Sequence, residues 1–132
     1  MNYATAFAAY RSAEVVTISQ RELIVKLYQG AERFLIQAQV SMTNGQREDA
    51  NTACQKAKRI FVELLSTLNR EQGGEIAERL HALYAFFISR ISMANAEMQP
   101  GILGEIVPII ADLRSGWEQI PDEFANVSSV AA

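Results

Sequence analysis

Hydrophobic residues recur every three or four positions in four separate stretches of the chain, which is the spacing of amphipathic helices. We predict helices over about 20–42, 47–68, 75–98 and 102–120. The residues predicted to face the core are Leu23, Leu27, Ala31, Phe34, Leu35 and Ala38 in the first helix; Ala50, Cys54, Ala57, Phe61, Leu64, Leu65 and Leu68 in the second; Ile76, Leu80, Tyr84, Phe87, Ile88 and Ile91 in the third; and Leu103, Ile106, Val107, Ile110, Leu113 and Trp117 in the fourth.

Helix-start and helix-stop signals separate the four stretches. Ser19 and Glu22 have the spacing of a capping box at the start of the first helix. Asn44-Gly45, the polar segment 69–74 and Gln99-Pro100-Gly101 break the pattern between helices. Because such short connections make neighbouring helices antiparallel, we predict an all-α, up-down-up-down four-helix bundle.

A length of 132 residues predicts a single domain covering residues 1–132. We expect the bundle to occupy residues 19–121, preceded by a mobile N-terminal segment (1–18) and followed by a flexible tail (122–132). Tyr3, Phe7 and Tyr10 recur at spacings of four and three, so the N-terminal segment is expected to contain a short helical piece.

Several apolar residues lie away from the predicted core faces. Val25, Ile36 and Val40 lie opposite Leu27 on the first helix, and Phe86 and Met93 lie roughly opposite the core face of the third. The apolar arc is widened by further residues, which are Ala53 and Ile60 in the second helix and Ile102, Ile109 and Ile120 in the fourth. Single exposed apolar residues are normal on a soluble protein. Runs of them on one stripe indicate instead a groove for an amphipathic partner helix, or a homodimer face.

Composition narrows the function classes. The chain is 49% hydrophobic and 20% charged, with a net charge of -3 and no basic block, so we do not expect nucleic-acid binding. No run approaches the roughly 18 apolar residues of a membrane span, and the first 13 residues do not resemble a signal peptide. A single cysteine, Cys54, fits a reducing compartment. We therefore predict a cytoplasmic protein without stable membrane insertion.

Candidate chemistry is sparse. Glu78 and His81 have the Glu-x-x-His spacing of di-iron bundles, but such sites need two of these motifs and the chain has one histidine. His81 on a helical bundle also leaves a phosphotransfer domain open, although Ala82 to Ala85 lack the lysine and glycine that usually follow such a histidine. Cys54 faces the predicted core and is expected to be structural. We predict neither catalysis nor a metal or cofactor.

Several stretches resemble the flagellar secretion chaperone family, which binds flagellin. Val15 to Gln20 partly match the family's Val-x-Thr-Ala-Ser-Pro stretch, and Leu27-Tyr28-Gln29-Gly30-Ala31 resembles its Leu-Tyr-Asp-Gly-Ala stretch. Segment 56–64 is similar to a Lys-Ala-Gln-x-Ile-x-x-Glu-Leu run, and segment 73–95 is the closest match. Gln20 and Gln29 replace the family's proline and acidic residue.

The resemblance implies a cytoplasmic, non-catalytic chaperone that captures the disordered C-terminal segment of flagellin and prevents premature polymerisation. We also expect the N-terminal segment, with Tyr10, to cover part of a groove until the client arrives. Export-gate components and a weak homodimer are expected as further partners, and a homodimeric helical-bundle interaction or regulatory protein is the alternative function. The partner-binding residues that we predict are Tyr10, Val25, Tyr28, Ile36, Val40, Ile60, Phe86, Met93, Ile102 and Ile109.

Overall fold

The computed structural model describes residues 19–121 and residue 128, and within them the chain forms four α-helices. These helices are α2 (Gln20–Thr43), α3 (Arg47–Ser66), α4 (Arg70–Glu97) and α5 (Pro100–Gln119). The predicted N-terminal helical piece, and with it Tyr10, lies outside the described residues.

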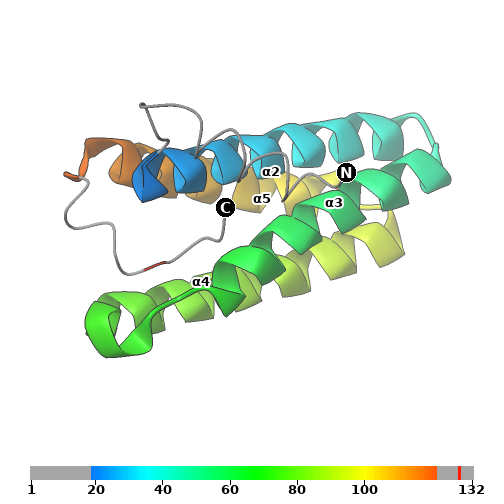
Figure 1. The fold of residues 1–132 in the computed structure, drawn as a ribbon. Coiled ribbons are helices and arrows are strands. Elements are labelled where there is room, and N and C mark those ends of the chain that lie inside the picture. Colours follow the sequence, from blue (N-terminus) through cyan, green and yellow to red (C-terminus); the bar gives the residue numbers. More distant parts are fainter. Residues whose placement is uncertain (1–18, 122–127, 129–132) are drawn as a thin grey trace, which may run out of the picture.

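The helices pack in the order in which they occur in the chain. Each helix contacts the next one, and α2 also packs against α5, so the four helices enclose one core (Figure 1). The sparsest of these four contacts is the seam between α4 and α5. The predicted all-α, antiparallel four-helix bundle is therefore confirmed.

The helix ends follow from local capping. The Ser19 hydroxyl accepts a hydrogen bond from the Glu22 amide at 3.1 Å, as expected of an N-cap. Helix α4 begins several residues earlier than predicted, because the Asn69 side chain accepts from the Gln72 amide at 3.0 Å and caps an extra turn. Gly74 separates this turn from the main helix with φ 53° and ψ −127°, a conformation that essentially only glycine adopts without strain.

The core of the bundle has a repeat of alternating three and four residues. This spacing is that of knobs-into-holes packing in helical bundles. The buried residues are Ile24, Tyr28, Ala31, Leu35, Ala38 and Met42 in α2; Ala50, Ala53, Cys54, Ala57, Phe61 and Leu64 in α3; Ala77, Leu80, Tyr84, Phe87, Ile91 and Ala94 in α4; and Leu103, Ile106, Ile110 and Trp117 in α5.

Two predicted positions, Ile76 and Leu27, differ from this core by one step of the helix. Ile76 was expected to face inward but is 60% exposed, and the smaller Ala77 beside it is buried. On α2 the centre of the seam is Ile24 and Tyr28, whereas Leu27 is only half-buried. Adjacent residues differ by 100° around a helix, so two neighbouring apolar residues cannot both occupy the middle of the core face.

A buried polar cluster joins three helices inside the core. The Tyr28 and Tyr84 hydroxyl oxygens are 2.6 Å apart, and the Trp117 indole N–H donates to the Tyr28 hydroxyl at 3.0 Å. The two tyrosine rings meet edge to face at 6.2 Å. Burial raises the pKa of Tyr28 to about 12 and also raises the pKa of Tyr84, so both stay neutral at physiological pH.

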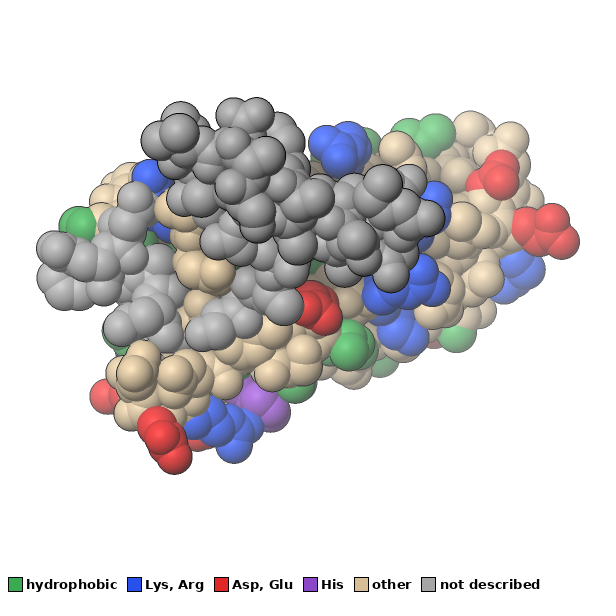
Figure 2. All heavy atoms as spheres, in the orientation of Figure 1, with side chains coloured by type: hydrophobic (Ala, Val, Ile, Leu, Met, Phe, Trp, Pro, Cys, Tyr) green, Lys and Arg blue, Asp and Glu red, His purple; other side chains and the backbone are tan. Residues whose placement is uncertain are grey.

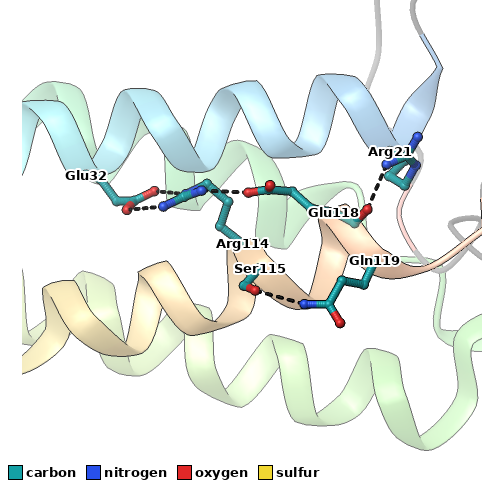
Figure 3. A network of polar contacts seen from close by, with 6 residues as sticks. All are labelled: Arg21, Glu32, Arg114, Ser115, Glu118 and Gln119. Carbon is teal, nitrogen blue, oxygen red and sulfur yellow. Dashed lines mark hydrogen bonds and ion pairs between the residues drawn. The ribbon is translucent and has the colours of Figure 1, made fainter.

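A second polar network lies nearer the surface and joins α2 to α5 (Figure 3). The Arg114 guanidinium donates to both carboxylate oxygens of Glu32, at 2.6 and 3.3 Å, and to Glu118 at 2.6 Å. Arg21 donates to the backbone carbonyl of Glu118 at 3.0 Å. The bidentate contact fixes α5 relative to α2 along the helix axes.

Candidate partner-binding surface

The first candidate surface is a ridge on the outer side of α2, formed by Ile36 and Val40. Both side chains are more than half exposed, with Ile36 at 51%. They lie one turn apart on the side of α2 that points away from the buried Leu35 and Ala38. We call this pair the α2 ridge; the prediction that these two side chains face outward is confirmed.

A cleft lies on each side of the α2 ridge. The cleft toward α3 has a volume of about 460 Å³, and its α3 wall carries Asp49, Thr52, Ala53 and Lys56. The cleft toward α5 has a volume of about 440 Å³ and is closed by the turn after α2 and by Pro100-Gly101. The ridge therefore separates two hollows, so an apolar side chain on either side of it would contact Ile36 or Val40.

The α2–α3 face is basic as well as apolar. Lys and Arg side chains gather on the part of this face that is visible in Figure 2. The Lys56 ammonium group lies 5.5 Å from the centre of the Phe34 ring, within the range of a cation–π contact. A partner bound in the α3-side cleft would meet the two apolar side chains of the α2 ridge and two polar ones (Gln37, Ser41) on α2, and both a cation and a carboxylate on α3.

The second candidate surface, the α4–α5 patch, consists of Phe86, Met93 and Ile109, each between about two-fifths and one-half exposed. Between the two α4 residues lies Arg90, whose guanidinium is 5.6 Å from the Phe86 ring centre and whose Nη1 is 3.6 Å from the Met93 sulfur. Arg90 also pairs with Glu105 of α5 at 3.2 Å. Because α4 and α5 are antiparallel, Ile109, four residues after Glu105, lies at the same height along the bundle as Phe86, four residues before Arg90.

The remaining predicted partner-binding residues are less accessible. Val25, Ile60 and Ile102 are half-buried and pack against the core. Ile60 packs against α2 at Gly30, where its Cδ1 is 3.4 Å from the position that a Cβ on Gly30 would take. Tyr28 requires a correction, because it is fully buried in the polar cluster and is not part of any surface.

The sequence reasoning missed a third surface, which we call the end cleft. It has a volume of about 330 Å³ and lies where the N-terminal half of α4 meets the C-terminal end of α5. Its lining is almost entirely apolar and consists of Ile76, Leu80, Leu113, Gly116, Trp117 and Ile120, with Asp112 at the side. The sequence signal that could have revealed this cleft is the pair Ile76-Ala77. Only one of two adjacent apolar residues can face the core, so the other is left at the surface.

The described residues offer little for catalysis. Among residues 19–121 and 128, no three His, Cys, Asp or Glu side chains are grouped closely enough to hold a metal ion. His81 is half-buried on α4, next to Leu80. Burial raises the pKa of the Cys54 thiol to about 11, so the thiol is protonated at neutral pH and is a poor nucleophile. No helix in this part of the chain has both the length and the apolar character required to cross a membrane.

The fold defines an all-α four-helix-bundle protein. Residues 3–123 match the family described as flagellar protein FliS, and the chain belongs to this family. It is 32% identical to the flagellar secretion chaperone FliS of Vibrio cholerae over 117 residues, which cover 89% of this chain and 86% of that protein. It is also 32% identical to the proteins of the same name from Campylobacter jejuni (87% of this chain, 90% of that one) and Bacillus subtilis (86% and 84%).

Proposed function

We propose that this protein is a cytoplasmic, non-catalytic chaperone that holds the disordered C-terminal segment of flagellin before export. The family to which it belongs supports the general role in flagellar secretion. The observation that carries the specific proposal is the α2 ridge, where two large apolar side chains remain exposed between two clefts. The core of α2 is already complete without them, so they are available to a partner.

The physical requirements of such a client match these surfaces. Apolar helices of a newly made subunit associate with one another when they are left uncovered. A segment that folds on binding must recover the free energy lost in ordering, and it does so by wrapping a large surface. The α2 ridge and the α4–α5 patch lie on different sides of the bundle, so one client chain that covered both would wrap around it. Binding in this way would block polymerisation, and export-gate components would receive the loaded complex.

The test is calorimetric titration of a flagellin C-terminal peptide into Ile36→Asp and Phe86→Asp variants. Each carboxylate is solvated in the free protein but would lose water in the complex, which costs several kcal/mol. We expect binding to weaken at least about thirtyfold, or about 2 kcal/mol, while melting changes little.

Val62→Asp is the matched control. Val62 is 51% exposed, the same as Ile36, but it lines none of the three surfaces. We expect this variant to bind the peptide as the wild type does. Leu64→Asp, which places a charge in the buried core, should instead unfold the bundle. Wild-type binding by both Ile36→Asp and Phe86→Asp would show that the client uses other surfaces.

A weak homodimer is the competing proposal. The α4–α5 patch contains its own ion pair, Arg90 and Glu105, and such a patch can pair with a second copy of itself about a two-fold axis. Sedimentation over a range of concentrations separates the two proposals. A tight dimer that the flagellin peptide neither binds nor dissociates would reject the chaperone proposal.

A further inference from the structure

The connector between α3 and α4 carries an unexpected backbone pairing. It consists of Thr67, Leu68 and Asn69, which lie between the end of α3 and the start of α4. Leu68 forms an isolated antiparallel β-bridge with Ser128, from the far end of the chain. Ser128 is completely buried, although serine is usually exposed in proteins. Figure 1 shows this residue as a short red segment beside the corner where α3 gives way to α4.

A side-chain hydrogen bond accompanies the bridge and has a definite direction. The Thr67 and Ser128 hydroxyl oxygens are 3.2 Å apart, and the Thr67 hydroxyl also donates to the Leu64 carbonyl at 3.0 Å. A hydroxyl has only one proton to donate. Since the Thr67 proton is used by Leu64, Ser128 donates and Thr67 accepts. The connector therefore engages both the backbone and the side chain of the residue that binds it.

A hollow also adjoins the connector. It has a volume of about 550 Å³ and is lined by the residues from Ser66 to Glu71, which include the whole connector. The Thr67 and Leu68 amides already donate to the Glu63 and Leu65 carbonyls, so another extended chain would pair with the Asn69 amide and the Thr67 carbonyl on either side of Leu68. The residues around Ser128, which read Val-Ser-Ser-Val, are uncharged and include β-branched side chains that favour an extended conformation.

We propose that the α3–α4 connector is a strand-addition site for an extended, uncharged segment with a small hydroxyl side chain, and that Ser128 is its built-in occupant. Strand addition of this type takes its affinity from backbone hydrogen bonds and its selectivity from alternate side chains. While the chain's own end is bound, the edge is closed to extended segments of other proteins. The site includes neither the α2 ridge nor the α4–α5 patch, so it is independent of the proposed flagellin binding.

Hydrogen exchange in the full chain and in a chain ending at Pro121 provides the first test. We expect the Asn69 amide to exchange about tenfold faster in the shortened chain, because its protection is local; the Thr67 and Leu68 amides, which donate to the Glu63 and Leu65 carbonyls, should exchange as before. The amides of α2 should be equally unaffected. Unchanged exchange at Asn69 would overturn the proposal.

A peptide of residues 122–132 provides the second test. In an NMR titration it should shift the connector resonances of the shortened chain and leave those of the full chain unaffected. In an antiparallel pair, the backbone N–H and C=O groups of every second residue point toward the partner strand. One of two peptides, N-methylated either at Ser128 or at both of its neighbours, should therefore lose binding. The proposal fails if the parent peptide binds both chains equally or neither, or if both methylated peptides bind like the parent.

A point variant keeps the test within the full-length protein. Ser128→Lys places a charge in a completely buried position, so the segment should leave and exchange at Asn69 should rise as in the shortened chain. Val62→Lys, at an exposed position, is the control for added charge and should leave exchange unchanged. Slow exchange in Ser128→Lys would contradict the proposal. Titration of the same samples with flagellin peptide measures the proposed function independently, so a failure of one proposal can be told from a failure of the other.

Discussion

The buried cluster of Tyr28, Tyr84 and Trp117 predicts an unequal effect of removing its two hydroxyl groups. Tyr28 is the hub, because both hydrogen bonds of the cluster are made to its hydroxyl, whereas Trp117 acts on the Tyr84 hydroxyl from outside hydrogen-bond geometry. Tyr28→Phe leaves the Trp117 N–H and the Tyr84 hydroxyl buried without partners, at about 1–2 kcal/mol each, so we expect a loss of about 3 kcal/mol. Tyr84→Phe leaves the bond between Trp117 and Tyr28 intact and should cost only about 1 kcal/mol.

The double variant provides the sharper test. It leaves only the Trp117 N–H without a partner, so its cost should be about 2 kcal/mol, which is less than that of Tyr28→Phe alone. Adding Tyr84→Phe to the Tyr28→Phe protein should therefore stabilise it. Urea unfolding followed by circular dichroism measures all four proteins, and equal slopes would show that the same surface is exposed in each. A double variant whose cost equals the sum of the single costs would refute the hub arrangement.

Three further predictions concern titration and ion pairing. Burial raises the pKa of Tyr28 to about 12, above its value near 10 in the unfolded chain. The neutral Tyr28 hydroxyl therefore contributes up to about 2–3 kcal/mol to the free energy of unfolding below pH 10, and this contribution is lost as the pH rises through about 12. Urea unfolding midpoints measured at rising pH would detect the loss. Cys54 should react with a thiol reagent at pH 8 only as fast as the protein opens, so equal rates in native and unfolded protein would contradict its burial. Arg114→Met should cost about 1–2 kcal/mol, because the largely buried Glu32 loses its partner, whereas Glu118→Gln should be nearly neutral in the same urea assay.

The bundle could be predicted from the sequence because its signals are local. Helical periodicity, the Ser19 cap and the short connections specify four antiparallel helices. Pattern alone did not settle which of two adjacent apolar residues faces inward. Ala77 is buried in place of Ile76, and Tyr28 is buried because Tyr84 and Trp117 satisfy its hydroxyl. Such a choice depends on contacts from other helices, which the sequence of one helix does not contain.

The candidate surfaces also have a part that could be predicted from the sequence and a part that could not. The outward positions of Ile36 and Phe86 followed from periodicity, because each lies far from its helix's core face. The two clefts beside the α2 ridge could not be predicted, since their walls come from different helices. The pairing of Leu68 with Ser128 joins residues 60 positions apart and has no periodic signal.

Trp117 can serve as an intrinsic fluorescent probe of one end of the bundle. It is the only tryptophan in the chain, so all indole emission comes from one place. Its ring lines the end cleft, while its N–H is held by the buried Tyr28. A ligand that entered this cleft would change the polarity around the indole, and separation of α5 from α2 would break its hydrogen bond. Emission wavelength and lifetime can therefore report events at this end of the bundle in an unlabelled protein, while contacts at the α2 ridge should leave the signal unchanged.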